Sequence, residues 1–419
     1  MTIFYTIAIL ITICSIFSYI NIKFIKLPSS IGLMLISLLL SLLILVIGNF
    51  DSSLKNLVVE FMSNLDFGSF LMQYMLCFLL FAGSLHVNFN LMKEQKWAIM
   101  AFTILGVLMA TFLIGYGFYY LGQWLNFNVP LIVCLLFGAL ISPTDPIAVL
   151  GILKQAKVPK SEEVVITGES LFNDGVGVVL FLTILQIANG TEPVTGGEVV
   201  KLLFQEVAGG ILLGLVFGFL GSKLLKTIDH YQTEVMITLA IVMGGYSLAS
   251  FLHTSGPLAM VVAGLVIGNY GREVAMSDIT RKYVDTFWEL VDELLNAFLF
   301  VLIGFEIVAI PSIQNYWFIG LLSILLALMV RFFSVYLPFK LFGLSKQLND
   351  KFPIIMTWGG LRGGISIALA LSLPNSEHKG LILAVTYAIV LFSVLVQGLS
   401  VSRLKEINEN GSYGILILD

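Results

Sequence analysis

The chain alternates long apolar runs with short polar segments along nearly its whole length. A helix needs about 20 mostly apolar residues to cross a bilayer core about 30 Å thick. Thirteen apolar runs can be marked out, the ninth of them short, and they cover residues 3–22, 29–49, 66–86, 98–121, 129–153, 162–188, 203–222, 233–252, 256–270, 286–308, 316–337, 352–373 and 380–401. The pattern predicts an all-α polytopic membrane protein with about thirteen transmembrane helices.

Basic residues gather in every second loop between these runs. Lys and Arg favour the cytoplasmic side of a membrane protein. One set of alternate loops, with the C-terminal tail, holds Lys23, Lys26, Lys93, Lys96, Lys154, Lys157, Lys160, Lys223, Lys226, Arg272, Arg281, Lys282, Lys340, Lys346, Lys351, Arg403 and Lys405. The other loops hold only Lys55, Lys201 and Lys379. We therefore expect a multi-pass protein of the inner or plasma membrane, with its N-terminus outside and its C-terminus in the cytoplasm.

Composition places the chain in the same class. Apolar residues make up 58% of it and charged residues 11%, with a mean hydropathy of +0.98, whereas soluble domains carry roughly a quarter charged residues. The apolar N-terminus lacks a basic region and a cleavage site, so we expect a first membrane helix there and no signal peptide. Short loops and the lack of a nucleotide-binding motif predict one transmembrane domain over residues 1–419. We expect no soluble domain, cofactor, nucleotide or nucleic-acid partner, and transport driven by ion gradients.

Two spans contain residues that break helices. The fifth includes Ser142–Pro146, where two prolines remove amide donors and clash with preceding carbonyls. The twelfth carries four glycines around Arg362 within Trp358–Gly364. Irregular backbone at membrane depth is tolerated only where protein buries it or where it lines a cavity. Because the two spans are seven apart, they run in opposite directions, which predicts inverted repeats with two broken, crossing helices. Two unrelated kinks are the alternative.

The sixth span places two carboxylates inside the membrane, within Gly168–Gly175. Such charges are costly unless they are paired or solvated. Ser170 and Asp174 lie four residues apart and share one helix face, while Glu169 and Asn173 share the adjacent face. The two carboxylates therefore have different partners.

Asp174 and Ser170 can face Asp145 of the broken fifth span. Together these side chains offer oxygen ligands, which suit a hard cation and argue against zinc or copper. Exposed carbonyl groups around Thr144 can complete the shell. We therefore expect a site for a cation and a proton at this place.

Buried charges at these breaks do not balance. Glu169 is free to pair with an arginine of another span, and Arg331 is the best candidate. Three carboxylates (Asp145, Glu169 and Asp174) then face two guanidinium groups (Arg331 and Arg362). A single proton or monovalent cation neutralises the remaining charge, which points to transport by Asp145 and Asp174.

A third group of acids stands near the cytoplasmic start of the tenth span. Glu289, Asp292 and Glu293 share one helix face. They can form a negative funnel that concentrates cations, or they can be an ordinary solvated helix end. Both interpretations stay open at this point.

These motifs resemble the sodium/proton exchanger family over essentially the whole chain. The segments that carry the resemblance are Ser142–Pro146, Gly168–Gly175, Ala249–Gly271, Arg331–Pro338 and Trp358–Pro374. The resemblance implies a homodimer of secondary transporters in which a core of about 98–188 and 316–401 moves as an elevator against a scaffold of about 1–97 and 203–308.

The resemblance also assigns roles to the charged motifs. It implies that the transported ion is held by Thr144, Asp145, Ser170 and Asp174. Glu169 and Arg331 form a structural pair, and Asn173 before Asp174 marks electroneutral one-for-one exchange. The chain departs from the family at Ala82, where many relatives carry an acid, so water or Ser84 would have to replace that ligand.

The expected function is therefore exchange of Na⁺, and also Li⁺, for H⁺. A K⁺/H⁺ antiporter of the same architecture is the alternative, because these oxygen ligands suit both ions. An intramembrane hydrolase with Ser170 as nucleophile is a more distant alternative, because neither His86 nor His253 is expected at the membrane midplane. A cation channel is a third alternative, but a pore does not require a pair of broken helices.

Overall fold

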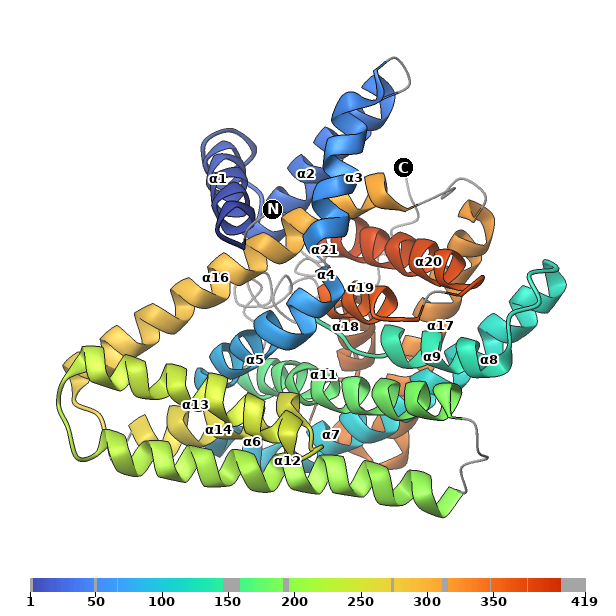
Figure 1. Cartoon of the computed structure of the whole chain (residues 1–419). Coiled ribbons are helices and arrows are strands. Elements are labelled where there is room, and N and C mark those ends of the chain that lie inside the picture. The colour runs from blue at the N-terminus through green and yellow to red at the C-terminus, as the bar shows by residue number, and fades with distance from the viewer. Residues whose placement is uncertain are drawn as a thin grey trace.

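The computed structural model describes residues 3–48, 51–65, 67–145, 159–190, 196–272, 275–310, 316–346, 348–374 and 376–400. These ranges are almost entirely helical (Figure 1). The N-terminal part contains α1 (Ile3–Ile20), α2 (Ser29–Ile47), α3 (Ser52–Leu65), α4 (Phe67–Phe70), α5 (Leu76–Leu85), α6 (Phe89–Glu94), α7 (Lys96–Met100), α8 (Gly106–Trp124) and α9 (Leu131–Ile141).

The rest of the chain continues in the same manner. It contains α11 (Lys160–Asn189), α12 (Gly196–Leu225), α13 (Tyr231–Phe251), α14 (Gly256–Val266), α16 (Asp278–Ala309), α17 (Trp317–Leu341), α18 (Phe352–Trp358), α19 (Gly364–Leu371), α20 (Lys379–Phe392) and α21 (Gly398–Ser400). Short π-helical segments extend or join several helices: η1 (Asn21–Ile25), η2 (Leu71–Met75), η3 (Ala101–Leu105), η4 (Ile267–Gly271) and η7 (Ser393–Gln397). A 3₁₀ turn, η6 (Leu344–Lys346), follows α17.

The all-α membrane fold expected from the sequence is confirmed, with differences in detail. Within the described ranges, eight helices are long and apolar enough to cross a membrane, and three apolar helices are shorter. The total of thirteen spans therefore stays a prediction. Helix α12 begins at Gly196 and takes in Lys201, which the sequence had placed in a loop. Helix α16 begins at Asp278, before the expected residue 286, because the Ser277 hydroxyl caps it by accepting from the Thr280 amide at 3.3 Å.

Helix α3 was not expected. It lies between the second and third spans and is amphipathic, with Leu54, Leu57, Val58 and Phe61 at helical spacing. Its polar residues make its mean hydropathy too low for a membrane span. The helical spacing of its apolar residues is the feature from which it could have been predicted.

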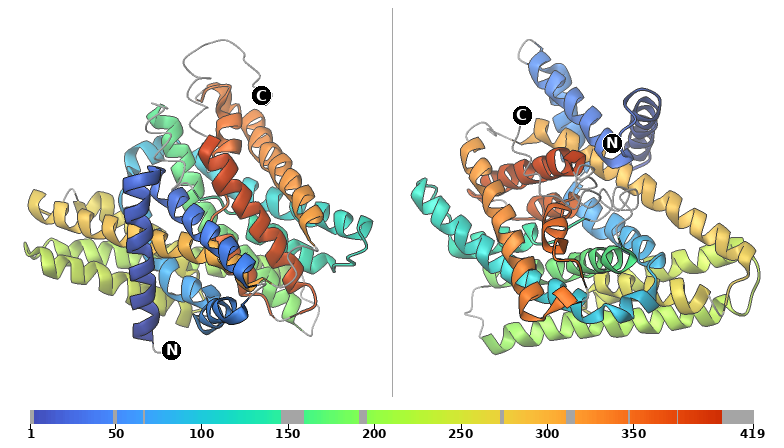
Figure 2. Two further views of the ribbon diagram at one scale, coloured as in Figure 1. Left: turned by 90° about the horizontal axis from the view of Figure 1, so that it is seen from above. Right: turned by 180° about the vertical axis from the view of Figure 1, so that it is seen from behind.

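The helices form two packed groups, which the two turned views separate (Figure 2). In one group α14 packs against α5, α12 and α13, while α16 packs against α2 and α5. In the other group α8 packs against α9 and α17, and α17 packs against α20. Helix α11 contacts both groups, since it packs against α9 and α14, and Figure 1 shows it running through the middle of the molecule.

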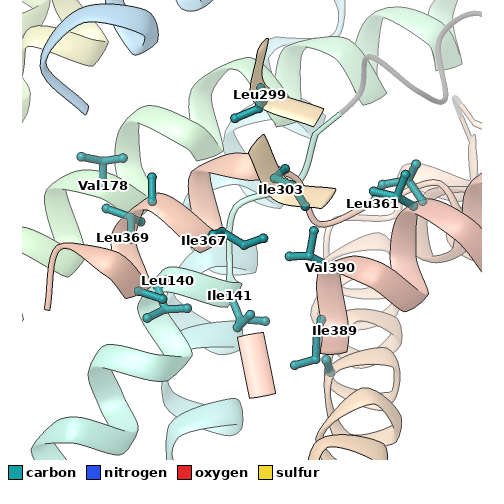
Figure 3. Packing of buried hydrophobic residues seen from close by; sticks show 14 of the residues in the cluster. Leu140, Ile141, Val178, Leu299, Ile303, Leu361, Ile367, Leu369, Ile389 and Val390 are labelled. Atoms are coloured by element: carbon teal, nitrogen blue, oxygen red, sulfur yellow. The ribbon is translucent and has the colours of Figure 1, made fainter. Parts of the chain in front are cut away.

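Apolar side chains from several helices meet around the helix breaks (Figure 3). Leu361, which lies in the twelfth-span break itself, is 1% exposed. The other labelled side chains come from α9 (Leu140 and Ile141), α11 (Val178), α16 (Leu299 and Ile303), α19 (Ile367 and Leu369) and α20 (Ile389 and Val390). This packing excludes lipid and allows irregular backbone at this depth.

Both predicted breaks are irregular in the described residues, and the two segments meet. Helix α9 ends at Ile141, and the twelfth span is irregular between Trp358 and Gly364. The Asp145 amide donates to the Leu361 carbonyl at 2.7 Å in an antiparallel bridge. Pro146 and the second half of the fifth span lie outside the described residues, as do Lys154, Lys157, Arg403 and Lys405.

Candidate ion-binding site

The break in the twelfth span is held by side chains of the last span. The Arg362 amide donates to the Ser393 hydroxyl at 2.8 Å, and Ser393 donates to the Gln397 side chain at 2.8 Å. Gln397 in turn donates to the Trp358 carbonyl at 3.1 Å. Backbone groups that lose helical partners must find others when they are buried. These polar residues of an otherwise apolar helix therefore stabilise the break.

The Arg362 guanidinium joins the two breaks. Its side chain is buried, and its Nη1 lies 3.3 Å from the carbonyl oxygens of both Ser142 and Pro143. These carbonyls follow the C-terminal end of α9, where the helix dipole favours a positive charge. Arg362 therefore compensates the negative end of one half-helix.

Two glycines let charged side chains approach the second break closely. A Cβ on Gly360 would stand 2.6 Å from Arg331 Nε, and a Cβ on Gly363 would stand 2.6 Å from Asp145 Oδ2. Both separations are too short for a side chain. Gly363 immediately precedes α19, so the Asp145 carboxylate lies beside the N-terminal end of that helix, where the dipole stabilises an anion.

Glu169 and Arg331 form the buried pair that the sequence pointed to. Arg331 Nη1 lies 2.7 Å from Glu169 Oε1 and Nη2 lies 3.2 Å from Oε2, so the contact is bidentate. Glu169 is 1% exposed and Arg331 is 5% exposed. The Asn173 amide also donates to Glu169 Oε1, at 2.9 Å. Glu169 is thus the centre of a polar network between α11 and α17.

Three of the expected cation ligands belong to this network. Thr144 Oγ1 lies 3.3 Å from Glu169 Oε2, and Ser170 Oγ lies 3.4 Å from the same oxygen. Asn173 donates to Thr144 Oγ1 at 2.8 Å, while its own oxygen accepts from the Thr144 amide at 3.3 Å. In this conformation Thr144 and Ser170 therefore face Glu169, although helical spacing had placed Ser170 on the side of Asp174.

Asp145 and Asp174 line a separate cavity of about 480 Å³. Asp174 is 8% exposed and Asp145 is half-buried. The two carboxylates are close enough to repel each other. Among the described residues that form the cavity wall, Thr144, Ser170 and Asn173 do not appear. The cavity therefore brings together a carboxylate of the first break and a carboxylate of α11.

The opposite wall of the cavity comes from α16. Glu289, Asp292 and Asn296 line it, whereas Glu293 does not. Of the two interpretations of these acids, the solvated helix end is wrong, because α16 begins at Asp278 and all three acids lie well inside it. Glu289 and Asp292 line the cavity, whereas Glu293 is exposed elsewhere on the helix. Asn296, together with Ser366 of α19, was missed from the sequence. An amide and a hydroxyl inside apolar runs beside a helix break are the signals that could have found them.

Of the two replacements expected for the acid absent at Ala82, water or Ser84, the Ser84 hydroxyl is engaged within its own helix. The Ser84 hydroxyl donates to the Phe81 carbonyl of its own helix at 2.9 Å, and its side chain is buried against α14. Ala82 packs in the apolar cluster around Trp288. The face of α5 that lines the cavity carries Gly83 and His86 instead.

The cavity has the chemistry of a transient site for a hard cation. Its ionisable and polar lining offers carboxylate, amide and hydroxyl oxygens, which suit hard cations. Within the described ranges, no three His, Cys, Asp or Glu side chains gather as a resident metal centre would require. The three cysteines are buried and free.

Comparisons with known proteins agree with this geometry. The family model for the transmembrane domain of sodium/hydrogen exchangers matches residues 8–406. The Na⁺/H⁺ antiporter NhaP of Pseudomonas aeruginosa is 45% identical over 403 residues, covering 95% of each chain. The Na⁺/H⁺ antiporter NhaH of Halobacillus dabanensis is 36% identical over 388 residues, covering 91% of this chain and 92% of that one.

A solved structure has the same fold. The sodium/proton antiporter MjNhaP1 of Methanocaldococcus jannaschii superposes with a TM-score of 0.78 at 22% identity, covering 97% of this chain and 99% of the other. The overall helix arrangement is thus one that a known structure also has.

Proposed function

The chain belongs to the sodium/hydrogen exchanger family, and on that premise we propose that it exchanges Na⁺ for H⁺ across the membrane. It is a secondary transporter and not an enzyme. The observation that carries the ion assignment is the pair of carboxylates, Asp145 and Asp174, on a cavity beside two crossing helix breaks. The K⁺/H⁺ alternative receives no support from the relatives named above.

The hydrolase alternative fails on chemistry as well. Ser170 Oγ lies between Thr144 and Glu169, and Glu169 is held by Arg331. A carboxylate in a bidentate pair with a guanidinium is a poor base for activating a hydroxyl. The family assignment and the geometry agree that Ser170 is not a nucleophile.

Cation and proton alternate at one site in the proposed mechanism. Asp174 and Asp145 bind Na⁺ when both are ionised, and a proton displaces it by neutralising the same charge. Thr144, Ser170 and Asn173 connect this site to the Glu169–Arg331 pair and hold α11 against the first break. The carrier reorients only when a cation or a proton has removed the excess charge, which prevents leakage.

Competition predicts a specific pH dependence. Below the pH at which half of the sites carry a proton, the apparent KM for Na⁺ should rise about tenfold per pH unit, because each proton removes one cation site. The maximal rate should change little. The measurement is Na⁺-dependent proton flux in proteoliposomes over a series of pH values, with Li⁺ and K⁺ compared. A pH effect confined to the maximal rate would instead indicate a separate regulatory proton site.

If exchange is electroneutral, the transport rate should not depend on the membrane potential. The three carboxylates and two guanidinium groups at the breaks leave one negative charge, which one Na⁺ or one H⁺ cancels. If each cycle moved a net charge, a potential of 100 mV would change the driving force by about 2.3 kcal/mol. Proteoliposomes with valinomycin and a K⁺ gradient provide that potential. Rates that follow its sign would contradict one-for-one stoichiometry.

Assembly and orientation complete the proposal. The core comprises residues of about 98–188 and 316–401, and the scaffold those of about 1–97 and 203–308, in a homodimer with the N-terminus outside. Support comes from the separate packing of the two helix groups and from α1 and α12, which expose apolar side chains such as Phe4, Phe204 and Phe219 on the surface. Cysteine crosslinking in native membranes and labelling from each side would test these points.

A further inference from the structure

Two buried side-chain oxygens on the cavity wall lack hydrogen-bond partners. Asn296 of α16 is 5% exposed; its amide nitrogen interacts with the Asp292 carboxylate, whereas its oxygen is unpartnered. Ser366 of α19 is 1% exposed, and its hydroxyl is unpartnered. Both residues line the cavity that Asp145 and Asp174 line. Leaving a buried polar group without a partner lowers stability, and these two oxygens stand on the wall of a cavity that also holds two carboxylates.

Asn296 stands at the inner end of a polar stripe on α16. Glu289, Asp292 and Asn296 follow each other at three and four residues, which places them on one face of the helix. Glu289 is exposed, Asp292 is half-buried and Asn296 is buried. The Asp292 carboxylate is also close enough to Asp145 to repel it. The stripe therefore runs from solvent toward the paired carboxylates.

Helix packing brings the two unpartnered groups toward the same place. A Cβ on Gly364, the first residue of α19, would overlap the side chain of Leu299, so α16 lies directly against the start of α19. Asn296 is one turn before Leu299 on α16, and Ser366 is in the first turn of α19.

We infer that Asn296 Oδ1 and Ser366 Oγ are ligands of the transported cation, together with the carboxylates of Asp145 and Asp174. This inference rests on the proposed function. The hydroxyls of Thr144 and Ser170 are already engaged with Glu169, whereas these two neutral oxygens belong to residues of the cavity wall and have no partner within the protein. Neutral ligands complete a coordination shell without adding charge. The site therefore keeps the single excess negative charge that one-for-one exchange requires. Asp292 and Glu289 deliver the cation to this shell.

Asn296→Leu is the principal test. Because the Asn296 oxygen has no partner, an apolar side chain of similar size should leave the melting temperature in detergent near that of wild type. The apparent KM for Na⁺ should rise about tenfold, with the same loss in Na⁺ affinity measured by calorimetry against choline chloride. Asn296→Asp keeps an oxygen in place and should hold the KM at or below the wild-type value. A KM for Asn296→Leu within twofold of wild type would overturn the inference, as would a KM for Asn296→Asp as high as that of Asn296→Leu.

Ser366→Ala tests the second ligand against a matched control. Ser323 of α17 is also 1% exposed with an unpartnered hydroxyl, but it does not line the cavity. Ser366→Ala should raise the KM about three- to tenfold, and Ser323→Ala should leave it unchanged. Equal KM values for the two variants would remove Ser366 from the shell. If wild-type protein binds Na⁺ but drives no proton flux, the proposed exchange fails while the calorimetric comparison still decides the ligands.

Discussion

Asp174→Asn should abolish Na⁺/H⁺ exchange while the protein still folds. The change keeps the size of the side chain but removes its negative charge, so neither a proton nor a cation can be bound by charge at this position. Because Asp174 is 8% exposed and lies near Asp145, loss of its charge also relieves repulsion and desolvation. The melting temperature in detergent should therefore stay the same or rise. The measurement is proton flux in proteoliposomes at saturating Na⁺, beside a melting curve.

Glu293→Gln provides the matched control. Glu293 carries an exposed carboxylate on α16 and does not line the cavity, so its loss should leave the rate near that of wild type. Asp145→Asn should behave as Asp174→Asn does, or raise the KM strongly. Exchange above about a tenth of the wild-type rate in a folded Asp174→Asn protein would remove this carboxylate from the mechanism.

Local sequence rules were sufficient for most of the fold. Apolar runs with the length of a bilayer core predict membrane helices whatever their neighbours, and Pro143 with the glycines around Arg362 predicts where helices must break. Helix α3 was not predicted because its polar residues lower its mean hydropathy below that of a membrane span. The start of α16 depends on the Ser277 cap, a single side chain that a hydropathy average does not register.

These local rules do not predict the contacts that side chains of the site make between helices. The i,i+4 spacing correctly grouped Asn173 with Glu169, because that relation is fixed by the helix alone. Ser170 was assigned to the side of Asp174, yet its hydroxyl lies at the border between two faces and is drawn to the Glu169 carboxylate. Which way such a group turns depends on the partner helix. Asn296 and Ser366 come together only through the packing of α16 on α19, which no local pattern encodes.

The position of Ala82 illustrates the same limit. An acid was expected there by resemblance, but Ala82 packs in an apolar cluster while Gly83 and His86 line the cavity. A shift of one residue turns a helical side chain by about 100°. The direction of each side chain therefore decides which residue of α5 meets the ion, and this requires the structure.

Glu169→Ala should destabilise the protein by about 3–5 kcal/mol, because it leaves a buried guanidinium without its counter-charge. Arg331 is 5% exposed, and its other hydrogen bond in the described structure is a 3.4 Å contact from Nη2 to the Met356 carbonyl. The substitution also removes the acceptor for Asn173 and Thr144. Melting in detergent should show a large drop in melting temperature, and the first break should loosen because Thr144 loses this anchor.

A double change separates the ion pair from simple loss of packing. Glu169→Gln with Arg331→Gln removes both charges and keeps polar side chains, so it should be more stable than either single change, as expected when the penalty comes from an unpaired charge. The exposed pair of Arg281 and Asp278, whose side chains are 37% and 98% exposed, is the control. Asp278→Asn should cost less than about 1 kcal/mol, because water screens that pair. Single changes at Glu169 and Arg331 that melt like the Asp278 variant would show that the buried pair does not stabilise the fold.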